Sequence, residues 1–141
     1  MANLKGCFSH QSDDWQTPPE IYYSFINNDF IDPCPYHADF DGLERKYIGK
    51  KLFVNPPYSN IEKWVDWLID LYLNNNCQFA LLVPSRTDTK WFHKLLDLSP
   101  FLHFYKGRLH FNNSKNAAPF PSVLITTITL SEIFPNYSYV R

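Results

Sequence analysis

Residues 78–83, QFALLV, form a near-continuous apolar run in the middle of the chain. Such runs are typical of strands in a parallel sheet that is covered on both faces, because neither face of the strand then meets water. The chain therefore has to supply helices for both faces of one sheet. This predicts an α/β architecture for the 141 residues, a length that suits a single domain, with residues 1–14 as an irregular lead-in.

The segments around this run alternate between strand and helix patterns. Residues 51–54 (KLFV) have the pattern of a buried strand, and residues 59–73 that of an amphipathic helix, capped by Ser59 or Asn60. Further elements are expected as a helix at 89–96, strands at 101–105 and 123–130, and a possible short piece at 109–111. Strand, loop and helix in this order make half of a βαβ unit, which favours a sheet with helices on both faces.

Two proline-containing segments come before the strand at 51–54. TPPEIYYSFINN predicts a first helix with Thr17 as its N-cap, and with Ile21, Phe25 and Ile26 as its buried stripe. The prolines of Asp32-Pro33-Cys34-Pro35 prevent regular strand pairing, so residues 33–50 are expected to be rich in loops.

The stretch Asn55-Pro56-Pro57-Tyr58 directly follows the strand at 51–54. Each proline fixes its own φ and keeps the preceding residue out of the helical region, so Asn55 is held in a stiff loop at the carboxyl end of the strand. In open α/β sheets ligands bind at that edge. On its own, the four-residue string is equally compatible with a tight strand-to-helix turn.

These residue types suit chemistry on the exocyclic amine of a nucleobase, whose lone pair is delocalised into the ring. The Asn55 side-chain oxygen and the Pro56 carbonyl oxygen can accept from its two N–H groups, which favours a pyramidal nitrogen with a free lone pair. Tyr58 offers a ring face to the base, a contact worth about 1–3 kcal/mol. A base in duplex DNA has to leave the stack to reach such a pocket.

Charge is distributed unevenly although the net charge is only −1. Residues 1–77 contain 6 Lys and Arg against 11 Asp and Glu, whereas residues 78–141 contain 7 against 3. Between Pro84 and Lys115 the basic residues, which include Arg86, Lys90 and Arg108, alternate with aromatic residues. This pattern suits a nucleic-acid surface, and a solvated rim around a core has equal standing from spacing alone.

Three cysteines without a C-x-x-C pair, the lack of a long apolar run and a start without a signal-peptide core favour a reduced, cytoplasmic setting. Cys7-x2-His10 and Cys34-x2-His37 share a spacing that zinc ligands also use. Buried thiols and partly exposed imidazoles explain these residues more simply, so no metal is expected.

Five stretches together resemble one known family. TPPEI ahead of DPCP, then FVNPPYSN, LLVPSRTDTKWFH, GRLHF and APFPSVLI are similar to the phage-type DNA N6-adenine methyltransferases, over about residues 15–126. The resemblance implies a compact, shortened Rossmann-like fold, S-adenosylmethionine as cofactor, DNA as partner, and methyl transfer to N6 of adenine in a bacterial or archaeal host cell, with a phage or prophage source.

The resemblance also implies roles for particular residues. The catalytic residues would be Asn55, Pro56, Pro57 and Tyr58. The cofactor-binding residues would be Thr17, Pro18, Asp32, Pro33 and Cys34. Asp39 or Asp41 would accept from ribose hydroxyls, unless both are solvated loop acids. Position and charge pattern, rather than the resemblance, indicate Arg86, Lys90 and Arg108 as the DNA-binding residues, of which Arg86 and Arg108 are otherwise exposed surface arginines.

Two alternatives stay open at this point. Related enzymes carry a Gly-x-Gly loop after the first strand, but none of the four glycines here forms that motif and DPCP stands in its place. A non-catalytic DNA- or nucleotide-binding relic would fit this departure. The Asn-Pro-Pro-Tyr chemistry also suits a glutamine amide in a protein, although the basic second half favours DNA.

Overall fold

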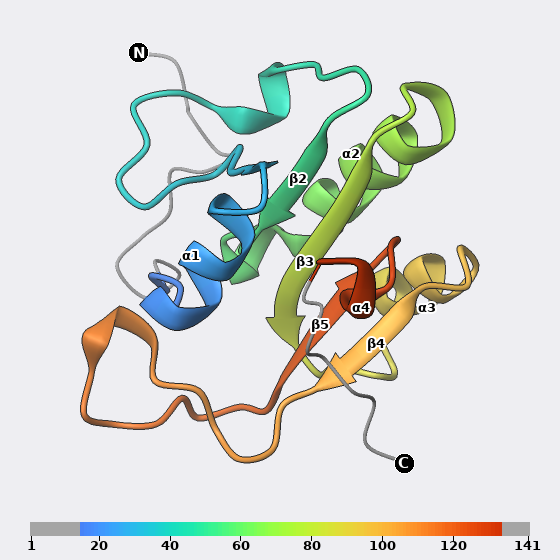
Figure 1. The fold of residues 1–141 in the computed structure, drawn as a ribbon. Coiled ribbons are helices and arrows are strands. Elements are labelled where there is room, and N and C mark those ends of the chain that lie inside the picture. Colours follow the sequence, from blue (N-terminus) through green and yellow to red (C-terminus); the bar gives the residue numbers. More distant parts are fainter. Residues whose placement is uncertain (1–14, 134–141) are drawn as a thin grey trace.

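A computed structural model describes residues 15–133, and the five strands in that range form one sheet in the order β1-β2-β3-β5-β4 (Figure 1). The strands are β1 (Phe30–Ile31), β2 (Lys51–Val54), β3 (Gln78–Pro84), β4 (Phe101–Phe104) and β5 (Ser122–Thr126). The first three are parallel, and β5 is antiparallel to both β3 and β4. The chain therefore runs in the same direction along β1, β2, β3 and β4, and all four end at the same edge of the sheet.

Helices cover both faces of the sheet, as Figure 1 shows. The helices are α1 (Pro19–Ile26), α2 (Ile61–Asn74), α3 (Lys90–Leu96) and α4 (Leu130–Ile133). Along β3, Leu81 and Val83 belong to the buried cluster beneath α2 and α3, whereas Ala80 and Leu82 belong to the cluster beneath α1. This alternation confirms an α/β sheet flanked by helices, and the arrangement is that of a shortened Rossmann-like fold.

The strongest sequence patterns predicted their elements closely. The apolar face expected for the second helix is buried in α2, where it consists of Ile61, Trp64, Val65, Leu68 and Leu71. Asn60, one of the two predicted caps of α2, does stand at the N-cap position, but its side chain makes no capping bond to the helix. The third helix has a true cap, since the Thr89 hydroxyl accepts from the Phe92 N–H.

The start of α1 differs from the prediction. Pro18 occupies the N-cap position and has no side-chain bond to the helix, so the prediction of Thr17 as N-cap was wrong. Ile21 and Phe25 are buried as expected, but Ile26 is only partly buried. The hydroxyl of Thr17 is therefore not used by its own helix.

Two strand predictions in the last third of the chain were also wrong. Residues 109–111 contain no strand, and Phe111–Asn113 form a 3-10 turn. The strand expected at 123–130 ends at Thr126, whose hydroxyl donates to the Ile128 carbonyl at 2.6 Å. That bond accompanies a turn of the chain into α4, so the β-branched residues that follow Thr126 do not extend the strand.

The segment between β1 and β2 is loop-rich, as expected, with one 3-10 turn at Gly42–Glu44. It folds back on its own beginning, because a Cβ atom at Gly42 would lie 2.0 Å from the Pro33 carbonyl oxygen. Only glycine permits this approach, which brings the loop against the turn after β1.

Candidate active site

Three predicted site residues follow three adjacent parallel strands. Asp32 comes directly after β1 and Asn55 directly after β2, while Arg86 comes two residues after β3. Because parallel strands end at a common edge, the structure brings all three to the carboxyl edge of the sheet. Thr17 joins them from the segment before α1, through a hydrogen bond to Asn55.

The amide group of Asn55 is held on one side only. Its Nδ2 donates to the Trp15 carbonyl at 2.5 Å and to the Thr17 hydroxyl at 2.9 Å. Its Oδ1 is buried and has no hydrogen-bond partner among the described residues. Buried polar atoms are almost always paired. The unpaired Oδ1 of Asn55 is therefore a hydrogen-bond acceptor that is available to a bound ligand.

Tyr58 lies within an aromatic cluster. Its ring stacks with that of Trp15, and the rings of Phe111 and Phe120 meet it edge-on. Its hydroxyl is buried without a partner among the described residues, and burial raises the pKa of this phenol well above its usual range. Tyr58 is therefore a neutral side chain with one ring face covered by Trp15.

Unpaired buried oxygens gather at this edge of the sheet. Ser85 follows β3, and Ser122 begins β5 opposite Pro84, so both lie at the carboxyl edge of β3. Like Asn55 and Tyr58, both serines have a side-chain oxygen that is buried without a partner among residues 15–133. The sequence prediction missed both serines, because a serine beside a strand end carries no distinctive signal.

The turn after β1 contains an unusual carboxylate. Asp32 accepts from the Cys34 N–H at 2.8 Å and from the Tyr22 hydroxyl. Burial outweighs these two bonds and raises the pKa of Asp32 from 3.8 to about 7. Burial and the nearby Asp32 also raise the pKa of Tyr22, to about 12. A carboxyl group with a pKa this close to 7, at the edge of the sheet where ligands bind, is a candidate binding residue.

The other acids predicted to bind cofactor have less to support them. Asp39 is exposed. Asp41 accepts from the Leu43 N–H at 3.0 Å as the N-cap of the short 3-10 turn, which is a structural role. Neither acid is brought to Asn55 by any contact that the structure describes.

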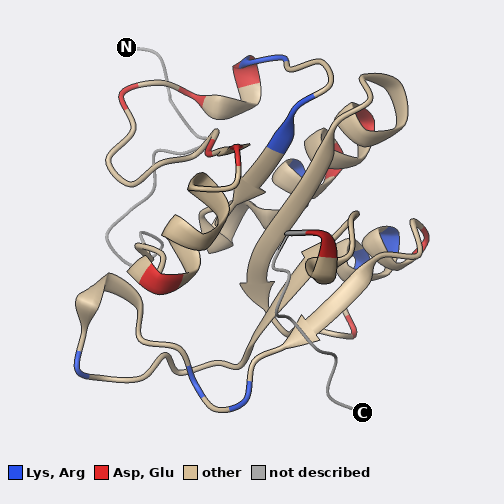
Figure 2. Cartoon of the chain, viewed as in Figure 1, with Lys and Arg blue, Asp and Glu red and all other residues tan. Residues whose placement is uncertain are grey.

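The predicted DNA-binding residues are exposed around the same edge. Arg86 and Lys90 lie after β3, and Arg108 lies in the loop between β4 and β5 that passes below the strand ends (Figures 1 and 2). This loop is fastened to the segment before α1, because the Gln16 N–H donates to Asn112 Oδ1 and the Asn112 N–H donates to the Gln16 carbonyl. The loop therefore borders the site.

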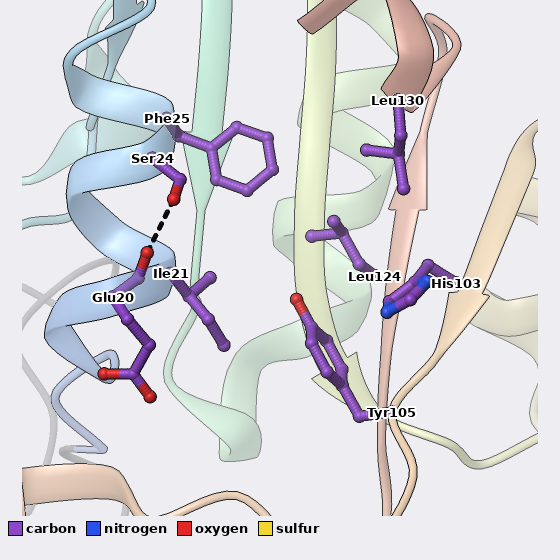
Figure 3. A pocket seen from close by; sticks show the side chains of 8 residues that line it. All are labelled: Glu20, Ile21, Ser24, Phe25, His103, Tyr105, Leu124 and Leu130. Atoms are coloured by element: carbon purple, nitrogen blue, oxygen red, sulfur yellow. Dashed lines mark hydrogen bonds between the residues drawn. The ribbon is translucent and has the colours of Figure 1, made fainter. Parts of the chain in front are cut away.

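A separate hollow of about 120 Å³ lies between α1 and the far strands β4 and β5 (Figure 3). Its lining consists of Glu20, Ile21, Ser24, Phe25, His103, Tyr105, Leu124 and Leu130. None of the predicted site residues is among them, so this hollow is distinct from the edge that carries Asn55.

Residues 15–133 contain no group of three or more His, Cys, Asp or Glu side chains placed to hold a metal ion. Cys7 and His10 lie outside the described residues. None of the described helices is both long and apolar enough to span a bilayer.

Comparison with protein families finds a match that covers most of the described residues. The model of one family, described as DNA N-6-adenine-methyltransferase (Dam), matches residues 35–131, which is more than half of the chain. The chain belongs to this family. A search of curated proteins finds no match.

The Dam match covers only part of the candidate site. It includes Asn55, Tyr58, Arg86 and the loop between β4 and β5, and it begins three residues after Asp32. Trp15 and Thr17 precede the matched range, and the sequence prediction missed Trp15. The hydrogen bonds of these two residues to Asn55, and the stacking of Trp15 on Tyr58, therefore come from a segment outside the Dam match.

Proposed function

We propose that this member of the Dam family transfers a methyl group from S-adenosylmethionine to N6 of adenine in DNA. The observation that carries the proposal is the unpaired, buried Oδ1 of Asn55 at the carboxyl edge of β2, within a segment matched by the family model. Asn55 Oδ1 and the Pro56 carbonyl accept from the two N6 hydrogens of an adenine turned out of its stack. This draws the lone pair out of the ring, so that N6 can form the new C–N bond. The C–S bond of the methyl donor would break in the same step and leave a neutral thioether, and the methylated N6 would then release a proton to water.

The donors and acceptors at this edge fit the proposed cofactor. Its amino and hydroxyl groups need acceptors, and Asp32 supplies a largely buried carboxylate while Ser85 and Ser122 supply unpaired oxygens. Pro18, Pro33, Cys34 and Asp39 complete the proposed binding set, whereas the Thr17 hydroxyl already bonds to Asn55. S-adenosylmethionine supplies, when bound, a methyl group on a sulfonium, which is electrophilic without any metal. The side chains of the protein bind, orient and exclude water.

The decisive experiment combines the reaction with one substitution. Purified protein is incubated with S-adenosylmethionine and unmethylated DNA, single-stranded and duplex, and the released nucleosides are measured by mass spectrometry. N6-methyladenine is expected from the wild type, and Asn55→Ala should lower the rate by roughly 100- to 1,000-fold, as loss of one preorganised polar contact does. Asn74→Ala, at an exposed site near the end of α2, should retain the wild-type rate.

A non-catalytic DNA-binding protein is the second candidate, because Trp15 already covers one ring face of Tyr58. Such a protein would bind DNA without producing N6-methyladenine and without measurable affinity for S-adenosylmethionine. Methylation of a glutamine amide would instead appear as a mass increase of a protein substrate. The Dam match favours DNA over this third possibility.

A further inference from the structure

The amide of asparagine has two ends of nearly equal shape, and only its neighbours decide which end faces the reacting atom. In Asn55 the neighbours are the Trp15 carbonyl oxygen and the Thr17 hydroxyl oxygen, at 2.5 and 2.9 Å from Nδ2. The carbonyl can only accept, so it has to face the NH2 group. With the amide reversed, Oδ1 would face this carbonyl and that hydrogen bond would be lost, whereas the Thr17 hydroxyl can donate as well as accept. The carbonyl therefore decides which end of the amide faces it, and the Thr17 hydroxyl holds the NH2 group in place.

The Thr17 hydroxyl is free to take this role. A threonine ahead of a helix commonly caps it, but α1 has Pro18 at its N-cap and no side-chain capping bond. The hydrogen bond of the Thr17 side chain that the structure describes goes to Asn55. The prolines at 18 and 19 stiffen the backbone on one side of Thr17, so its hydroxyl is presented from a fixed position.

We propose that Thr17 is a positioning residue, which together with the Trp15 carbonyl locks the Asn55 amide so that Oδ1 faces the substrate amine. The proposal rests on the proposed function for the identity of that amine. The locked oxygen matches the transition state, in which N6 is pyramidal, better than the ground state, in which the amine is flat. Thr17 therefore acts on the methyl-transfer step through Asn55 and does not touch the substrate itself.

The kinetic test compares Thr17→Val, which keeps the shape and removes the hydroxyl, with Thr17→Ser, which restores the hydroxyl. Thr17→Val should lower kcat by about tenfold, the effect of one hydrogen bond, with the KM values for cofactor and DNA within about twofold of wild type. Thr17→Ser should restore most of kcat. A raised cofactor KM at unchanged kcat would overturn the proposal and place Thr17 in cofactor binding instead.

A second measurement does not depend on activity. The side-chain 15N–1H2 signals of Asn55, assigned by their loss in Asn55→Ala, should exchange slowly with solvent in the wild type. They should shift and exchange faster in Thr17→Val and return in Thr17→Ser. The Asn74 amide, which donates to Asp70 at 2.7 Å, should stay unchanged in all variants and thereby report intact folding.

The two measurements separate the two proposals. If no substrate is methylated but the Asn55 signals respond to Thr17→Val as described, the proposed function fails and the locking of the amide stands. If the wild type methylates adenine and the Asn55 signals are unmoved by Thr17→Val, the proposed function stands and the role of Thr17 is overturned.

Discussion

The indole of Trp15 stacks on the phenol ring of Tyr58, with ring centroids 6.2 Å apart and planes inclined by 17°. Phe111 and Phe120 meet the indole edge-on at 5.8 and 5.3 Å, so the stack is held from the loop between β4 and β5. A base that stacks on the same face of Tyr58 has to take the place of the indole. Base entry and movement of Trp15 are therefore linked.

Replacing Trp15 by phenylalanine tests this link through fluorescence. We expect adenine-containing single-stranded DNA to change the tryptophan emission of the wild type, because the indole leaves its stack. Trp15→Phe should lose most of this change while it still binds DNA. Trp91→Phe is the matched control, since Trp91 is buried on α3 and belongs to the opposite cluster. An equal change in Trp15→Phe and wild type would show that the base reaches Tyr58 without displacing the indole.

The sequence predicted those parts of this site that depend on local pattern. The apolar run at 78–83 and the face of α2 formed as expected, because burial of several side chains on one face outweighs local alternatives. Asn55 reached the sheet edge because a proline-rich loop after a strand has few conformations. Trp15 could not be predicted, because its contacts join residues far apart in the chain. Ser85 and Ser122 could not be predicted either, because a serine beside a strand end carries no distinctive signal. The prediction of Thr17 as the N-cap of α1 was wrong because the partner of its hydroxyl, Asn55, lies 38 residues away.

Asp32 makes the stability of the fold depend on pH. Its pKa is about 7 in the folded protein against an ordinary value of 3.8, so the folded state binds the proton more tightly. The contribution of this group to stability is therefore complete below about pH 4 and is lost as the pH rises to about 7. Asp32→Asn keeps a neutral acceptor for the Cys34 N–H and should flatten this part of the profile.

The measurement is chemical denaturation of wild type and Asp32→Asn at several pH values between 4 and 8. The stability difference between the two proteins should move in favour of the variant as the pH rises through this window. Asp97→Asn, at an exposed site that ends α3, is the control and should follow the wild type. A constant difference between Asp32→Asn and wild type across the window would contradict the raised pKa.

Two hydroxyls on β5 are equally buried but differ in pairing. Thr126 donates to the Ile128 carbonyl, whereas the Ser122 hydroxyl has no partner among the described residues. Thr126→Val should lower the free energy of unfolding by about 1 kcal/mol, and Ser122→Ala should leave it unchanged or raise it slightly. Ser122→Ala should instead weaken binding of S-adenosylmethionine in calorimetric titration. Equal destabilisation by both changes would mean that Ser122 has a structural partner.

Arg108 allows a test of the DNA surface that separates specific contact from general charge. It is exposed in a loop that is fastened beside the site through Asn112 and Gln16, so a phosphate contact here would place DNA next to Asn55. Arg108→Ala should weaken duplex binding and reduce the slope of log K against log salt by about 0.9, the effect of one lost phosphate contact. Lys63→Ala, an exposed site on α2, removes the same charge and should leave the slope nearly unchanged. Equal reductions in both variants would mean that only the total charge matters, and DNA would then have no fixed path across this loop.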